Sequence, residues 1–227
     1  MPGRPQLRPL AALGLVAATA SLVLLSLPRL LGLAGGAGPE VASVLTREAD
    51  PPVSLRLAGD PSPLRGRALD FRRITVAEEG EGRARAVSTL DFDGALGGTR
   101  VSSLGREITH FRRRAGGWEL DGSLAPTLAG AVSALAARSR ALERGDTAAL
   151  AALVAPRDRD RAMADPGLRR LLESPAVRTP PRAWYLRSEA DEVTISEERG
   201  DPPQLRRLVL VPRSPGSAEF VFAGSLL

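Results

Sequence analysis

The sequence predicts an α+β protein with an N-terminal transmembrane helix, an antiparallel β-meander, and then helices followed by a second set of antiparallel strands. Three observations carry this prediction. An apolar run extends from Leu10 to Leu27, apolar and polar residues alternate over residues 67–122, and the apolar spacing becomes helical after Pro126. The alternation then returns over the last strands of the chain, which is typical of an α+β arrangement.

The apolar run from Leu10 to Leu27 contains no charged residue and is long enough to span a membrane. A helix over it, at about 1.5 Å per residue, is roughly 27 Å long, close to the thickness of a bilayer's hydrocarbon core. Arg4 and Arg8 precede the run, and no acidic residue occurs before Glu40. By the positive-inside rule, residues 1–9 are predicted to stay in the cytoplasm and the remainder to be extracytoplasmic.

Residues 10–33 admit two interpretations. They form an uncleaved single-pass anchor, or they form a signal peptide that is cleaved at the small residues 34–38 and releases a secreted or periplasmic body. The anchor is the leading prediction, because the apolar run is longer than the roughly 7–15 residues of a signal peptide. With no cysteine, the body folds without disulfides and carries no lipid on a cysteine.

Arginine supplies the positive charge of the chain, since the sequence contains no lysine. The formal net charge is +5, and three of the arginines flank the membrane segment, which leaves about +2 for the exported body. A nucleic-acid-binding protein needs a concentrated basic face, so no nucleic-acid partner is predicted. The chain is 43% hydrophobic but only 4% aromatic, so its core is expected to consist mainly of Leu, Val and Ala.

The first half of the body is predicted to be mostly strand. Residues 34–66 are expected to be a linker with a short helix and a short strand, because proline and glycine interrupt them repeatedly. Residues 67–122 are expected to be the meander, with a bulge at Arg72-Arg73 and a bend at Gly105. The predicted elements are a helix over 40–50 and strands over 53–57, 68–78, 83–93, 99–114 and 118–121.

The second half, residues 126–227, is predicted to contain helices and then strands. Apolar residues at helical spacing form one stripe of a long first helix, comprising Leu128, Val132, Leu135, Ser139 and Leu142. Gly145 is expected to end that helix in the left-handed conformation, and Asp146 to cap the next helix. Further helices are predicted over 147–155 and 166–173, a charged turn over 157–161, and strands over 182–189, 192–198, 204–211 and 218–225. The apolar stretch at 208–211 predicts a strand that is covered on both faces.

The element order of residues 126–227, together with the sequence ALERGDTAAL at 141–150, resembles the nuclear transport factor 2-like superfamily. This resemblance implies helices packed on a strongly curved antiparallel sheet that encloses a cone-shaped cavity. It further implies a function among isomerases, dehydratases and non-catalytic binding or assembly modules. Residues 67–122 are interpreted either as a degenerate second copy of that fold or as a β-extension of it.

Four residues in the family-like half are candidates for lining the cavity: Trp184, Tyr185, Glu189 and Glu197. Enzymes of the superfamily commonly use a His–Asp or Asp–Tyr arrangement in the cone. The second half has no histidine, and Tyr185 has no acidic partner that the sequence identifies. No phosphate-binding loop, dinucleotide fingerprint, nucleophile elbow or zinc motif occurs in the chain, so no catalytic residue, cofactor or metal is predicted.

Weaker polar candidates lie in the meander. His110 is the only histidine, and it is either a general base at a cavity mouth or, as we favour, an ordinary residue on a sheet face. Asp91 and Asp93 share a strand face, but the following residues do not continue a calcium loop, so they are interpreted as a pair of acids near a hairpin end.

Arg112, Arg113 and Arg114 form the densest basic feature of the exported body. They are candidates for contact with anionic lipid headgroups, and the favoured alternative is a solvated hairpin tip. Taken together, the sequence predicts a membrane-anchored extracytoplasmic module for binding or assembly, with another envelope protein as the partner. The alternatives are an exported carrier of a small apolar ligand and, behind it, a cone-cavity isomerase or hydrolase.

Overall fold

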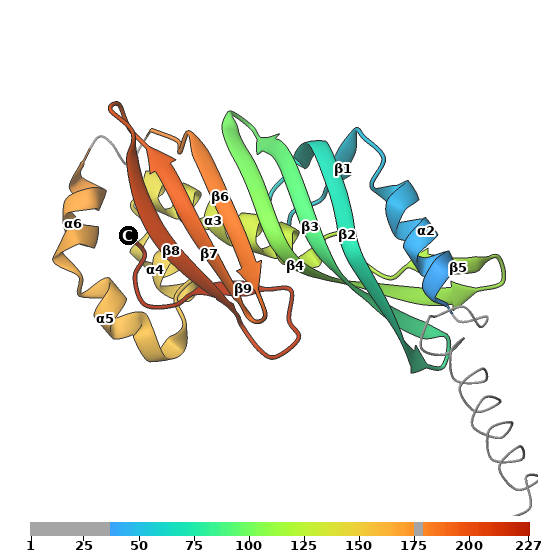
Figure 1. Ribbon diagram of the computed structural model, residues 1–227. Coiled ribbons are helices and arrows are strands. Elements are labelled where there is room, and N and C mark those ends of the chain that lie inside the picture. Colours follow the sequence, from blue (N-terminus) through green and yellow to red (C-terminus); the bar gives the residue numbers. More distant parts are fainter. Residues whose placement is uncertain (1–36, 175–178) are drawn as a thin grey trace, which may run out of the picture.

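The computed structural model describes residues 37–174 and 179–227 (Figure 1). The predicted membrane segment, Leu10 to Leu27, lies outside these residues. None of the helices within the described ranges has the length and apolar character that crossing a membrane requires.

The described part of the chain is an α+β fold built on one mixed, mostly antiparallel sheet of nine strands. The strand order is β1-β2-β3-β4-β6-β7-β8-β9, and β5 pairs with the far end of β4. The strands are β1 (Val53–Leu55), β2 (Leu64–Gly80), β3 (Arg83–Leu96), β4 (Thr99–Arg114), β5 (Gly117–Leu120), β6 (Ala183–Glu189), β7 (Glu192–Arg199), β8 (Gln204–Pro212) and β9 (Phe220–Phe222). The predicted meander and the strands of the second half therefore belong to one continuous sheet.

The two sets of strands join where β4 runs parallel to β6. This pairing extends from Arg100 beside Ala183 to Gly105 beside Ser188, and all other strand pairs are antiparallel. Gly105 has a φ of 149°, and a Cβ at this position would lie 2.2 Å from the carbonyl oxygen of Ser188. Gly105, where a bend was predicted, is thus a point of close backbone approach between the two halves, and the pairing of β4 with β6 ends there.

Helices cover one face of the sheet. Helix α2 (Gly38–Glu48) packs on β2, β3 and β5, and α3 (Pro126–Arg144) crosses behind the strands in the view of Figure 1. Short helices follow at the β8 end of the sheet: α4 (Thr147–Ala152), η1 (Pro156–Asp158), α5 (Arg159–Met163) and α6 (Pro166–Glu173). This arrangement leaves the opposite sheet face without a covering helix from the described part of the chain.

The core lies between α3 and the covered face of the sheet. Leu128, Val132, Leu135 and Leu142 of the predicted helical stripe are buried, as are the residues predicted to share one face of β3. Those residues of β3 are Ala84, Ala86, Ser88, Leu90 and Phe92. The predicted bulge in β2 is also confirmed, because its register against β3 shifts between Arg72 and Thr75.

The turn between α3 and α4 confirms the predicted capping. Gly145 has a φ of 66° and donates its backbone N–H to the carbonyl of Leu142 at 3.1 Å. The Asp146 carboxylate accepts the Ala149 N–H at 2.9 Å, which satisfies one of the unpaired donors at the start of α4.

Three local predictions were wrong. Residues 157–161 are not simply a solvated turn, because η1 and α5 occupy them and Asp158 accepts the Gly224 N–H at 3.1 Å. Helix α4 ends before residue 155, because Leu153 and Ala155 form backbone hydrogen bonds to Phe222 instead. Residues 208–211 are not fully covered on both faces, since Leu208 and Leu210 are buried while the valines between and after them are half-buried.

Candidate functional site

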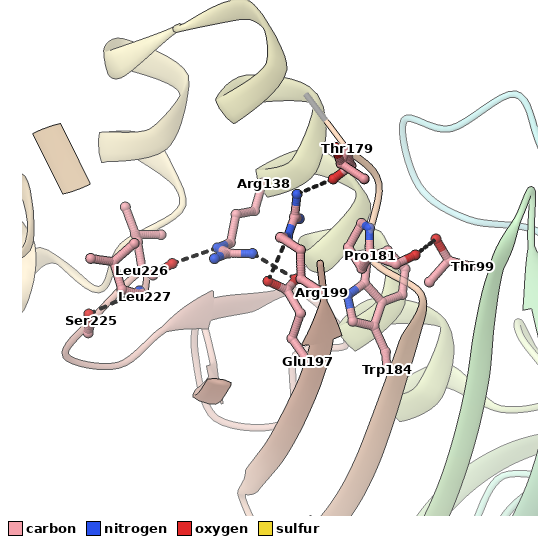
Figure 2. A network of polar contacts seen from close by, with 10 residues as sticks. All are labelled: Thr99, Arg138, Thr179, Pro181, Trp184, Glu197, Arg199, Ser225, Leu226 and Leu227. Carbon is pink, nitrogen blue, oxygen red and sulfur yellow. Dashed lines mark hydrogen bonds and ion pairs between the residues drawn. The ribbon is translucent and has the colours of Figure 1, made fainter. Parts of the chain in front are cut away.

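A fully buried cluster of charged side chains joins α3 to the second half of the sheet (Figure 2). The Glu197 carboxylate on β7 accepts hydrogen bonds from Nη1 of Arg138 at 3.0 Å, Nε of Arg199 at 3.3 Å and Nε1 of Trp184 at 3.1 Å. Nε of Arg138 also donates to the carbonyl of Leu226 at 2.7 Å. The side chains of Arg138 and Glu197 are both 0% exposed.

The surroundings of Glu197 keep it ionised. Burial alone would raise the pKa of its carboxyl group, but the charges of Arg138 and Arg199 and the hydrogen bond from Trp184 outweigh burial and lower it. Such a carboxylate is a poor proton acceptor near neutral pH. The cluster therefore holds α3, β6 and β7 together, and nothing in its chemistry suits Glu197 to acid–base work.

The four predicted cavity residues do not share a cavity. Trp184 and Glu197 lie on the helix-covered face of the sheet, within the buried cluster. Tyr185 and Glu189 point to the opposite face, where the Tyr185 hydroxyl donates to Glu198 at 3.2 Å and Glu189 accepts from Arg187 at 2.6 Å. Side chains alternate along a strand, so Trp184 and its neighbour Tyr185 are on opposite faces.

His110 lies at the edge of a pocket with a volume of about 250 Å³. The pocket opens where β4 diverges from β6, between β4, the start of α3, the β6–β7 turn and the loop before β9. Its lining includes Ile108, Thr127, Asp191 and Glu192 in addition to His110. The structure thus places the histidine on an exposed sheet face, where it is one of the residues that line a pocket.

Glu107 lies directly behind this pocket, on the covered face of β4. Its carboxylate accepts the backbone N–H groups of Thr127 at 2.8 Å and Leu128 at 3.1 Å, at the start of α3, and that of Ile108 at 3.3 Å. Burial raises the pKa of Glu107 to about 7, although these hydrogen bonds oppose the shift. Glu107 therefore provides the N-terminal cap of α3, which has no side-chain cap from its own segment.

Sequence reasoning missed Glu107, Arg138 and Arg199. The alternation of β4 indicated that Glu107 is buried, because Glu107 shares the buried phase of Val101, Ser103 and Thr109. Arg138 similarly follows Leu135 at helical spacing, next to the apolar stripe. A charged residue in a buried phase indicates a buried polar contact, although the pattern does not identify the partner.

The two acids of β3 form exposed or half-exposed ion pairs. Asp91 lies 3.3 Å from Nη2 of Arg72, and Asp93 lies 3.2 Å from Arg67 and 3.0 Å from Arg100. Across residues 37–174 and 179–227, no group of three or more His, Cys, Asp or Glu side chains is placed to hold a metal ion.

The three consecutive arginines lie at the end of β4 that pairs with β5. Arg112 forms an ion pair with Asp121 at 3.1 Å, and Arg114 approaches Glu119 at 3.7 Å. The backbone N–H of Arg113 donates to the carbonyl of Gly82 at 2.7 Å. All three side chains are exposed, and their contact with lipid headgroups stays a prediction.

The sheet face opposite the helices, called the open face below, carries the exposed large apolar side chains of the described chain. Leu104 on β4 is 53% exposed, Tyr185 on β6 39% and Leu205 on β8 70%. The strand register places Leu104 beside Arg187 and Tyr185 beside Ser102. Leu104 and Tyr185 are therefore diagonal neighbours on adjacent strands. Leu205 lies beside Glu198, which accepts the Tyr185 hydroxyl hydrogen bond.

Comparisons with protein-family models, with curated proteins and with solved structures found no match to this chain.

Proposed function

We propose that this protein is a membrane-anchored, extracytoplasmic module that binds another envelope protein through the open face of its sheet. The observation that carries the proposal is the open face itself, on which Leu104, Tyr185 and Leu205 stand exposed among charged and hydroxyl side chains. Exposed apolar groups rimmed by polar residues are typical of protein–protein contact surfaces, and aromatic residues are enriched there.

The membrane part of the proposal rests on the sequence. The apolar run from Leu10 to Leu27 follows Arg4 and Arg8, which favours a cytoplasmic N-terminus and an exported body. A module tethered in this way meets its partners in or near the same membrane. Tethering also raises the effective concentration of the partner, so a modest contact area is sufficient for assembly.

We further propose that the second half of the body is a nuclear transport factor 2-like module. The turn at Gly145 and Asp146 between α3 and α4, and the antiparallel order of β6, β7, β8 and β9, support this assignment. The buried pair of Arg138 and Glu197 occupies the space between α3 and this sheet, where members of that superfamily have a cavity. A filled interior favours a binding or assembly role over a cone-cavity enzyme.

The anchor is tested by fractionating cells that express the full chain and measuring the intact mass of the protein. We expect the uncleaved chain in the membrane fraction, resistant to an alkaline wash. Recovery of a soluble form shortened by about 38 residues would remove the anchor from the proposal.

The binding role is tested by purifying the protein from native membranes with its partners attached. A Leu104→Ser/Tyr185→Ser/Leu205→Ser variant is expected to lose the partner that the wild type retains, because the apolar contact area is removed. An Arg169→Ser/Arg170→Ser variant of α6, which changes exposed residues on the helix side, is the matched control and should retain it. The proposal fails if the open-face variant, folded with an unchanged Tm, retains the same partner.

A further inference from the structure

The pocket beside His110 has walls of opposite charge. One wall consists of Arg85 on β3 and His110 on β4, which lie directly across from each other in the strand register. The other wall is the β6–β7 turn, where Asp191 and Glu192 line the pocket. His110 and the β6–β7 turn both lie beyond Gly105 and Ser188, where the pairing of β4 with β6 ends.

The floor of the pocket is apolar. Ile108, Val193 and Phe220 contribute to it, and the last two are buried. The volume of about 250 Å³ lies below the roughly 300–1,000 Å³ that is typical of pockets for drug-sized molecules. A ligand of this pocket is therefore small, with an apolar part that reaches the floor.

We propose that this pocket binds a small zwitterion with an apolar side chain, as in a free α-amino acid of the leucine type. Its carboxylate is bound by Arg85 and His110, its ammonium group by Asp191 and Glu192, and its side chain by the apolar floor. The site is separate from the exposed apolar residues of the open face and does not depend on their role in assembly.

Charge complementarity distinguishes this ligand from simpler ones. A purely anionic ligand would be repelled by Asp191 and Glu192, and a purely cationic one by Arg85. An uncharged apolar ligand would desolvate both walls without replacing their hydrogen bonds to water. A ligand that carries both charges on one small head satisfies both walls at once.

The existing contacts of the charged side chains leave them able to bind such a ligand. Arg85 uses Nε in an exposed ion pair with Glu79 at 3.3 Å, and the N–H groups of its terminal nitrogens suit a carboxylate. Glu192 accepts a hydrogen bond from the Thr194 hydroxyl at 3.2 Å through one oxygen. Its second oxygen is available for an ammonium group, since a carboxylate accepts through both of its oxygens.

Two further contacts give the pocket a fixed shape. The buried carboxylate of Glu107 binds the backbone N–H groups of Ile108 and Thr127, both of which line the pocket. On the other side, the loop before β9 approaches α3 so closely that a Cβ on Gly130 would lie 1.9 Å from the carbonyl oxygen of Ala218. These contacts fix the start of α3 relative to β4 and the loop before β9 relative to α3, which favours preorganised binding.

The proposal is tested by calorimetric titration of the full-length protein in nanodiscs with four probes: L-leucine, N-acetyl-L-leucine, L-leucinamide and glycine. L-leucine is expected to bind most tightly. The two blocked forms each lose one charged contact and should bind about tenfold more weakly or worse. Glycine, which lacks the side chain, should also bind more weakly than L-leucine.

Variants then assign the two walls. Arg85→Gln is expected to weaken the binding of L-leucine about tenfold and to change the binding of L-leucinamide little. Asp191→Asn/Glu192→Gln should weaken the binding of L-leucine and change the binding of N-acetyl-L-leucine little. The matched controls are Arg100→Gln and Asp70→Asn, which alter exposed, ion-paired strand residues outside the pocket and should leave binding unchanged. Absence of L-leucine binding, or equal binding of L-leucine and either blocked form, would overturn the proposal.

Discussion

Glu107 and Glu197 are both buried carboxylates, yet their surroundings shift their pKa values in opposite directions. The hydrogen-bonding partners of Glu107 are all uncharged, so burial dominates and raises its pKa to about 7. Glu197 lies between Arg138 and Arg199, whose positive charges lower its pKa despite its burial. Stability should therefore respond to these two acids in different pH ranges.

For Glu107, the free energy of unfolding is expected to fall as the pH rises from about 4.5 to about 7. In this range the carboxyl group is protonated in the folded state and ionised in the unfolded state, so higher pH favours unfolding. The shift of the pKa from its ordinary value of 4.5 corresponds to a loss of roughly 3 kcal/mol across the range.

The Glu107→Gln variant removes this titration. The unfolding free energy is measured in urea at about pH 5 and about pH 8 for the wild type and the variant. The wild type should lose most of the roughly 3 kcal/mol between these two pH values, and the variant should not show this loss. An unchanged difference would show that Glu107 has an ordinary pKa in the folded protein.

Glu197→Gln is expected to destabilise the protein by about 3–5 kcal/mol at neutral pH, because it leaves the buried charge of Arg138 without its counterion. Adding Arg138→Met should restore part of the loss relative to the single variant, since the uncompensated charge is then removed as well. Urea unfolding of the wild type, the single variant and the double variant measures both effects. A loss below about 1 kcal/mol for Glu197→Gln would contradict a structural role for the pair.

At the scale of single residues, the sequence predicted that Trp184 and Glu197 line a cavity, whereas both belong to the buried charge cluster. The alternation of β7 places Glu197 in the same buried phase as Val193 and Ile195. Its main partner, Arg138, lies in α3 and is brought close only by the packing of that helix on the sheet. Local periodicity identifies which residues are buried but carries no information about distant partners.

Among the elements, the junction of β4 and β6 depends most on a single residue. Gly105→Ala is expected to destabilise the protein by about 2 kcal/mol or more, because the new Cβ would clash with the backbone of Ser188 and the φ of 149° disfavours alanine.

Thermal unfolding of Gly105→Ala and of the control Gly98→Ala measures this effect. Gly98 lies in the turn between β3 and β4, where a Cβ meets no atom within 4 Å, so the control should change the unfolding free energy by less than about 0.5 kcal/mol. Equal effects of the two substitutions would show that the close approach at Ser188 is unimportant.

Element prediction succeeded where local signals determine the structure. Helix α6 begins and ends at the predicted residues, Pro166 and Glu173, and β4 matches its predicted range. Helix α4 was predicted too long because its end is set by hydrogen bonds to Phe222, which is far away in the sequence. The parallel pairing of β4 with β6 was not predicted for the same reason, since alternation does not determine which strand edges meet.

For the whole molecule, one continuous sheet presents helices on one side and an open face on the other. The helix side contains the core, the buried charge cluster and the cap of α3, and the open face carries Leu104, Tyr185 and Leu205. Together with the predicted membrane anchor, this asymmetry favours a module that is tethered at one end and binds its partner through the sheet.

Photo-crosslinking in native membranes tests this account most directly. A photoreactive amino acid is placed at Leu104 or Tyr185 of the full-length protein, and at Arg170 on α6 as the control position. We expect a discrete adduct with another membrane or envelope protein from the two open-face positions and none from Arg170. Binding through the open face is contradicted if positions 104 and 185 give no adduct, or if position 170 gives the same one.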